Sequence, residues 1–393
     1  MQLEQYIAIS QGLRENMAKA DYASFDPFDG LNSRLFKKTP LYNSSFFRLC
    51  LIQFNKRSPV NLRTLLLVPK MRNPKGIALV ILGLLEDYRR TQSVAFLEEA
   101  QRLADWLLAH PCSRVEWGHF CWGYHFDWQS RAFYVPTTTP NIITTSYIAR
   151  ALFALADALN RADYRKAALD ATQFISDRLY TEKDGQVFFA YIPDETVFVY
   201  NASLWGAAVV AQAGALLNDQ ALLAQAHTAV VQAVFAQRPD GSWSYGTRSH
   251  HQFIDSFHTG YNLEALCLYQ QHTGHTEFTP AIGRGLKFYR EQFFLQDGTP
   301  KYYQNNTYPI DMHSASQAIL TLLQVGGTEA DKKLAQQVLD WSIDNMYIRD
   351  SGFFKYQKTR WFDNRICYFR WTQAWVYYAM SVFEKAMPIT SAL

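Results

Sequence analysis

Residues 238–246 read RPDGSWSYG, an Asp-Gly turn followed by alternating aromatic side chains. Similar strings recur as EKDGQVFFAY around Gly185, LQDGTPKYY around Gly298 and RDSGFFKYQ around Gly352. Together with Gly123, these glycines are separated by 62, 56, 57 and 54 residues. A turn followed by alternating aromatic residues predicts a short β-hairpin in each loop. The chain is therefore built from repeating units of about 57 residues.

Pairs of predicted helices lie between these loops. The first helix of each pair is apolar nearly all round, as in NASLWGAAVVAQAGALL at 201–217, whereas the second has a polar face, as in ADKKLAQQVLDWSIDNM at 330–346. A helix that is apolar all round is buried, and an amphipathic helix covers it from outside. The inner helices are expected to start near residues 75, 143, 201, 257, 313 and 367. Stacked repeats bury their faces against their neighbours, so the pattern predicts an all-α (α/α)6 toroid with short β-hairpin loops at one end.

The last inner helix has no outer partner after it, because the printed chain ends at residue 393. A helix at 3–19 or the region 44–69 can fill that place and close the ring. A toroid of seven hairpins, with 44–69 forming the seventh, is the alternative. No linker divides the repeats. We therefore expect one toroid domain over 1–393, with closing helices in 1–70 and repeated hairpins in 71–393.

Composition narrows the class of protein. Apolar residues make up 48%, aromatic residues 15% and charged residues 19%, which excludes a disordered chain. The net charge is +3 with the charges interspersed, which is not the footprint of a nucleic-acid-binding protein. The longest apolar run, 77–85, is shorter than the roughly 20 residues that span a bilayer. Glu4 and the lack of a basic leader predict a cytoplasmic protein, and five scattered cysteines fit reduced thiols.

The paired helices with Asp-Gly-aromatic loops resemble the (α/α) toroid superfamily. That superfamily contains six-hairpin glycosidases, polysaccharide lyases and epimerases, and terpenoid cyclases. The stretch QRPDGSW at 237–243 is similar to a repeat of squalene-type cyclases, but the cyclase motif Asp-X-Asp-Asp is absent. Residues 25–33, FDPFDGLNS, and 53–63, QFNKRSPVNLR, resemble poorly characterised proteins of bacterial and archaeal polysaccharide-biosynthesis clusters. The resemblance implies a saccharide setting and transfers no catalytic residue.

The starts of the inner helices and the loops before them are expected to line one mouth of the ring. Aromatic faces suit the apolar C–H faces of sugar rings, and an arginine beside a histidine suits a carboxylate such as that of a uronic acid. The predicted saccharide-binding residues are Trp122, Tyr124, Tyr200, Trp205, Trp243, Tyr245, Arg248, His251, Tyr302, Arg365 and Arg370. The alternatives are core packing for the aromatic residues and surface charges or ion pairs for the others.

Two neighbouring repeats carry an aligned Ile-Asp element with a histidine close behind it. Asp255 precedes His258, and Asp311 precedes His313. These four residues are the predicted catalytic groups, since a carboxylate and an imidazole supply a general base and acid, and two facing carboxyl groups serve glycoside hydrolysis. Helix N-capping alone explains the aspartates, because Asp is a preferred N-cap residue. Capping does not require the histidines.

A group of possible zinc ligands, His119, Cys121 and His125, falls short of the four ligands of a structural site, so no metal is predicted. The chain contains no nucleotide or nicotinamide motif, so no cofactor is predicted. The sequence favours an enzyme that binds and processes a saccharide by hydrolysis, lyase elimination or epimerisation in polysaccharide biosynthesis. A non-catalytic saccharide-binding or assembly factor and an isoprenoid or peptide cyclase are the alternatives.

Overall fold

The computed structural model describes residues 1–129 and 134–387. Six helices, two of them adjoining a short π-helical segment, form an inner layer. They are α3 (Pro74–Thr91), α6 (Ile142–Leu159), α8 (Tyr200–Leu217), α10 (Ser256–Thr273), α12 (Met312–Thr321) followed by η5 (Leu322–Gly326), and α14 (Ala374–Ala386) preceded by η6 (Phe369–Gln373). Counted from η6 for the last one, their first residues lie within two positions of those expected from the repeat, whereas α14 itself begins seven residues after the expected 367. The glycine spacing therefore located every inner helix correctly.

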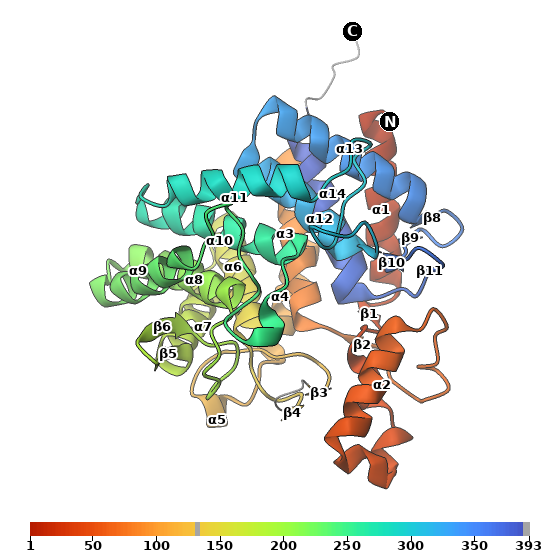
Figure 1. Ribbon diagram of the computed structural model, residues 1–393, viewed down its shortest axis with the longest axis horizontal. Helices are drawn as coiled ribbons and strands as arrows, with labels where there is room; N and C mark the ends of the chain where they lie inside the picture. Colours follow the sequence, from red (N-terminus) through yellow and green to blue (C-terminus); the bar gives the residue numbers. More distant parts are fainter. Residues whose placement is uncertain (130–133, 388–393) are drawn as a thin grey trace.

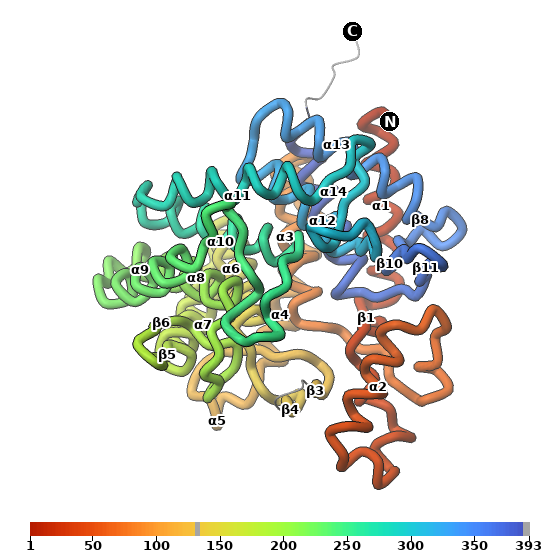
Figure 2. The backbone as a smooth tube through the Cα atoms, viewed as in Figure 1, coloured from red at the N-terminus to blue at the C-terminus, as the bar shows by residue number. Residues whose placement is uncertain are grey.

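The inner helices form a closed ring. Each contacts the next in chain order, and α14 returns to α3 (Figure 1). An outer helix follows each of the first five: α4 (Val94–Ala109), α7 (Ala162–Leu179), α9 (Gln220–Phe235), α11 (Thr279–Gln292) and α13 (Glu329–Met346). The sixth outer helix is α1 (Leu3–Lys19), which packs on α14 so that the first and last helices lie side by side (Figure 2). The predicted (α/α)6 toroid is confirmed.

The glycine loops all lie at one end of the ring, because each joins the end of an outer helix to the start of the next inner helix. The first amide of an inner helix donates a hydrogen bond to the carbonyl of an aromatic residue in the following loop. The four pairs are Ile142 to Tyr191 (2.9 Å), Tyr200 to Tyr245 (3.3 Å), Ser256 to Tyr302 (2.9 Å) and Met312 to Tyr356 (3.2 Å). Since the first amides of a helix have no partner within it, the repeated aromatic residue satisfies one of them in each of these four units. The loops thus form a belt around the mouth.

Short strands strengthen this belt. Hairpins enclose Gly185, between β5 (Tyr180–Lys183) and β6 (Gln186–Phe189), and Gly352, between β8 (Tyr347–Ile348) and β9 (Phe353–Phe354). The remaining strands are β3 (Trp128–Gln129) with β4 (Tyr134–Val135), β1 (Ala23–Ser24) with β2 (Met71–Arg72), and β7 (Ile310–Asp311) with β10 (Gln357–Lys358) and β11 (Asp363–Asn364). The predicted hairpins are confirmed at Gly185 and Gly352. The prediction of a hairpin in every loop is wrong, because the Gly298 loop has a single bridge, Phe294 with Pro300, and the described loop around Gly241 is a tight turn without paired strands.

The segment between β1 and β2 forms no seventh hairpin. It contains the 3-10 turns η1 (Asp29–Asn32), η2 (Phe36–Lys38) and η3 (Pro40–Asn43), and the helix α2 (Ser45–Arg57), which projects beside the ring in Figure 1. Helix α2 contacts η1, η3 and β3. A buried ion pair between Arg63 and Asp29 (2.6 Å) anchors the segment. It therefore covers part of the loop end.

Among the described residues, α6 is the single helix long and apolar enough to cross a bilayer by length and composition, and 72% of that stretch is buried inside the protein. Its apolarity follows from its place in the inner ring.

Candidate functional site

One side chain from each inner helix meets at the axis of the ring. We call this set the axial cluster: Lys75, Tyr147, Trp205, Tyr261, His313 and Trp375, from α3, α6, α8, α10, α12 and α14 in turn. All six are at most 2% exposed. Three of them, Tyr147, Trp205 and Tyr261, are the sixth residue of their helices, so equivalent turns point to the same place. The ring symmetry thereby gathers polar and aromatic groups into its centre.

A hydrogen-bonded chain runs through the cluster. The Lys75 Nζ lies 2.9 Å from the Tyr261 hydroxyl, which lies 2.9 Å from Nε2 of His313. The amine also sits over the rings of Tyr147 (4.7 Å) and Trp375 (5.1 Å). Burial is the main cause that lowers the pKa of Lys75 well below its usual range, and the Arg370 charge adds to it. Its hydrogen-bond partner is a neutral hydroxyl, so the uncharged amine is favoured here.

His313 is buried and uncharged at neutral pH. Burial is the main cause that lowers the pKa of its imidazole well below 6.5, and the Arg370 charge adds to it. The ring stacks on Trp375 with centroids 4.6 Å apart. Among the described residues, its Nδ1 has no hydrogen-bond partner, and neither do the Tyr147 hydroxyl or the Trp205 indole nitrogen. Buried polar atoms are almost always paired, so these three atoms are available to bind water or a ligand.

His258 forms a dyad with Asp255 beside the cluster. One oxygen of Asp255 accepts the backbone N–H of His258 (2.8 Å), and the other accepts its Nδ1–H (2.7 Å). The His258 side chain is 19% exposed, and Asp255 is buried. The Phe257 ring lies between the two histidines, with its centroid 3.8 Å from the His258 ring and 4.5 Å from the His313 ring. Adjacent inner helices thus present one imidazole supported by a carboxylate and one buried neutral imidazole.

Asp311 caps α12 and also orients its surroundings. Its carboxylate accepts hydrogen bonds from the His313 backbone N–H (2.8 Å), the Gln357 amide (2.6 Å) and the Trp371 indole (3.1 Å). Burial raises the pKa of this carboxyl to about 6. Both predicted catalytic aspartates are therefore N-caps, and each has a second contact that capping does not need. Their part in chemistry stays a prediction.

Several of the predicted saccharide-binding aromatic residues lie around the two histidines. Tyr245 lies 4.6 Å from His258, and Tyr302 lies 5.6 Å from Phe257, between ring centroids. Trp205 belongs to the axial cluster. The Tyr124 hydroxyl meets that of Tyr191 (2.6 Å), and Tyr200 packs on Phe198 (4.8 Å) at the start of α8.

Two predicted tryptophans face the outer helices instead. The indole of Trp122 donates to the carbonyl of Leu107 (3.0 Å) in α4, and that of Trp243 donates to Ala233 (3.0 Å) in α9. Both are buried. Their equivalent hydrogen bonds fasten a loop to the end of the helix that precedes it, which is a packing role.

The predicted cationic groups are partly engaged within the protein. Arg370 is buried and forms a bidentate pair with Asp26 (2.7 and 2.8 Å). Arg248 lies 3.3 Å from Glu195, and Arg365 is exposed. His251 packs edge-on against Tyr245 (4.9 Å). An anionic substrate would therefore compete with protein carboxylates at two of the three arginines.

The possible zinc ligands near residue 120 have separate partners. The imidazole of His119 contacts Asp170 (2.8 Å), that of His125 contacts Asn73 (2.8 Å), and Cys121 is buried.

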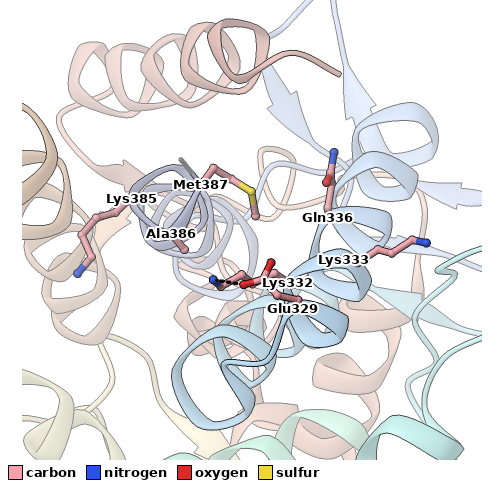
Figure 3. A pocket seen from close by; sticks show the side chains of 7 residues that line it. All are labelled: Glu329, Lys332, Lys333, Gln336, Lys385, Ala386 and Met387. Atoms are coloured by element: carbon pink, nitrogen blue, oxygen red, sulfur yellow. Dashed lines mark hydrogen bonds and ion pairs between the residues drawn. The ribbon is translucent and has the colours of Figure 1, made fainter. Parts of the chain in front are cut away.

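A surface hollow of about 450 Å³ lies at the other end of the ring, between the start of α13 and the end of α14 (Figure 3). Glu329, Lys332, Lys333, Gln336, Lys385, Ala386 and Met387 line it. It is far from the inner-helix starts, and its lysine-rich lining holds none of the axial groups. The unpaired buried atoms therefore place the candidate site at the loop end.

Sequence analysis missed Lys75, Tyr261 and Asp26. Lys75 is the one charged residue in the first three turns of an otherwise apolar inner helix, which is a signal that reasoning from motifs passed over. Aligning the inner helices by their starts would have matched Tyr261 to Trp205. The pairing of Asp26 with Arg370, 344 residues away, has no local signal.

No protein-family model matches the chain, and no curated protein matches it. Solved structures do. Cellobiose 2-epimerase from Bacillus thermoamylovorans has a TM-score of 0.64 at 11% identity, with 80% of this chain and 87% of that chain covered. Unsaturated glucuronyl hydrolase from a Bacillus species has 0.60 at 12%, covering 97% and 96%. A D-mannose isomerase has 0.59 at 10%, covering 80% and 87%. These similarities show that the chain has the (α/α)6 toroid fold of carbohydrate epimerases, isomerases and six-hairpin hydrolases.

Proposed function

We propose that this protein epimerises or isomerises a sugar by moving a proton at carbon, with His258 and His313 as the acid–base pair. The observation that carries the proposal is the difference between the two imidazoles: His258 is supported by Asp255, and His313 is buried and neutral with a free Nδ1. Proton transfer at carbon needs one group ready to accept and another ready to donate. The epimerase and the isomerase among the similar structures support this choice.

The hydrogen-bonded chain sets the roles. The Lys75 Nζ donates a hydrogen bond to the Tyr261 oxygen, and the same oxygen accepts the Nε2–H of His313. That tautomer leaves Nδ1 of His313 as an unprotonated base. Asp255 accepts the Nδ1–H of His258 and so fixes the ring, whose Nε2 is then the proposed acid.

The proposed step acts on an open-chain sugar. His313 takes the proton next to the carbonyl, the C–H electron pair forms a C=C bond, and the carbonyl becomes an enediolate oxygen. His258 then returns a proton to the opposite face of the same carbon, which gives the epimer, or to the neighbouring carbon, which gives the isomer. A proton-shuttling step restores both imidazoles through solvent, since His258 is partly exposed.

Hydrolysis is the second candidate, favoured by one observation. Burial raises the pKa of Asp311 to about 6, which suits a general acid, and one similar structure is an unsaturated glucuronyl hydrolase. Against it, three donors already occupy the Asp311 carboxylate, and Asp255 is committed to His258.

The proposal also includes the pathway and the cellular location in which the protein acts. The resemblance of 25–33 and 53–63 to proteins of polysaccharide-biosynthesis clusters supports a cytoplasmic role in building a polysaccharide, with an oligosaccharide or monosaccharide as substrate. A saccharide-binding factor without catalysis is the alternative that the experiment below separates.

The test is proton exchange followed by NMR. A panel of aldoses, ketoses and reducing disaccharides is incubated with the protein in D₂O, and we expect deuterium at the carbon next to the carbonyl of one substrate class, with its epimer or isomer. His258→Asn and His313→Asn should lose the exchange while still folding. His110→Ala, an exposed histidine at the end of α4, is the matched control and should keep it.

Glycoside cleavage without deuterium incorporation would replace the proposal by hydrolysis. Saccharide binding with neither reaction would replace it by the binding factor.

A further inference from the structure

Three potential metal ligands converge on the outer surface, away from the axial cluster. His227 lies on α9, and His275 and Glu277 lie in the turn between α10 and α11. One Glu277 oxygen is 2.9 Å from His227 Nε2 and 3.3 Å from His275 Nδ1, and all three ligand atoms lie within 4.8 Å of one another. Two consecutive hairpins of the ring thus bring two imidazoles and a carboxylate to one point.

These separations are close to those of a filled zinc site. With Zn–N and Zn–O bonds of about 2.0–2.2 Å, tetrahedral ligand atoms lie about 3.3 Å apart. Two sides of the triangle already have that length, and the third, between the nitrogens, has to shorten by at most about 1.5 Å, which side-chain rotation supplies. The ligand set, two His and one Glu, matches a three-residue zinc site with one position left for water.

The backbone of the turn fixes two of the ligands. Gly274 ends α10 in the left-handed conformation (φ +73°), and its amide bonds the Gln270 carbonyl (2.9 Å). The Thr273 hydroxyl accepts the His275 amide (3.2 Å). These contacts direct His275 and Glu277 toward α9 before any ion arrives.

The two imidazoles pack against buried aromatic side chains. The His227 ring lies 6.0 Å from Phe278, and the His275 ring lies 6.2 Å from Tyr269, between centroids. Both aromatic residues are buried and contact each other at 5.7 Å. The metal ligands therefore rest on a packed surface, unlike three independent surface side chains.

We propose that His227, His275 and Glu277 bind a divalent transition-metal ion of the zinc class, which links the third hairpin of the ring to the fourth. An exposed His–Glu ion pair alone contributes little to stability, whereas three coordinate bonds cross-link two repeats. The site is independent of the proposed sugar chemistry, since none of its ligands belongs to the axial cluster or the Asp255–His258 dyad.

The test is zinc binding to the full chain after treatment with a chelator. Isothermal titration calorimetry with ZnCl₂ should give one equivalent, and zinc should raise the melting temperature of the wild type. His227→Ala and Glu277→Gln should each lose the binding and the zinc-dependent shift. Co²⁺ in place of zinc should show visible absorption bands that the same variants lose.

Two controls locate the ion. His110→Ala removes an exposed histidine elsewhere, and His258→Asn removes the accessible histidine of the sugar site, and both should still bind one equivalent. The proposal is overturned if the wild type binds no zinc, which leaves an ion pair only, or if His227→Ala binds as well as the wild type. Sugar turnover is not a readout here, so failure of this site leaves the proposed function standing.

Discussion

Asp255 caps α10 and also contacts the His258 ring, and a single substitution can separate these two roles. Asn caps helices about as well as Asp, so Asp255→Asn should leave the free energy of unfolding within about 0.5 kcal/mol of the wild type. The neutral amide holds the His258 ring less firmly than the carboxylate does, so deuterium exchange into the sugar should fall by roughly 10²-fold or more. Asp255→Ala should lose the exchange and also about 1 kcal/mol of stability. Urea denaturation and the NMR assay measure both, and an Asp255→Asn variant that is destabilised but fully active would reduce Asp255 to a cap.

Asp311 should make stability depend on pH in a defined direction. Its pKa is raised by burial from 3.8 to about 6, so the folded protein holds a proton there that the unfolded chain has lost. The stabilisation from this group is complete below about pH 4 and is lost as pH rises through 6, a change of about 3 kcal/mol. Relative to the wild type, Asp311→Asn should therefore gain up to about 3 kcal/mol between pH 4 and pH 7.5. Parallel stability curves for the two proteins would show that Asp311 is ionised throughout.

The loop glycines act as contact points between repeats. A Cβ on Gly241 would lie 2.3 Å from the Arg284 carbonyl oxygen of α11, whereas a Cβ on Gly185 would meet nothing within 4 Å. Both have positive φ, +92° and +74°, so both alanine variants carry the left-handed strain of about 1 kcal/mol. Gly241→Ala should lose about 2 kcal/mol more than Gly185→Ala, because the backbone of α11 must move. Equal losses in urea denaturation would mean that the close approach is not needed.

At the scale of the helices and loops, some elements could be predicted from the sequence and others could not. The spacing of glycines and aromatic residues predicts all six inner helices, since each unit repeats the same contacts and so repeats the same residues. The segment 23–70 has no such periodicity, and its covering role depends on long-range pairs such as Arg63 with Asp29 and Asp26 with Arg370. For the site, pattern alone identified the aligned histidines, but the axial partner Lys75 required knowing which inner helices face one another.

At the scale of the whole molecule, α1 completes the outer layer of the ring by packing on α14. Leu13 of α1 and Leu103 of α4 are each fully buried on the inner side of an outer helix. If α1 packs as tightly as α4, Leu13→Ala and Leu103→Ala should each cost about 2–5 kcal/mol. A loss below about 0.5 kcal/mol for Leu13→Ala alone, measured by urea denaturation, would show that the first helix frays from a ring that holds without it.

The central claim is that the loop end of the ring binds a sugar in reach of both His258 and His313. A crystal structure with a sugar alcohol, the reduced form of whichever sugar exchanges deuterium, tests it most directly because the alcohol cannot react. The account predicts the ligand at the mouth, with hydroxyl oxygens about 3 Å from Nδ1 of His313 and Nε2 of His258. A sugar alcohol bound elsewhere on the protein, with both nitrogens out of its reach, would contradict it.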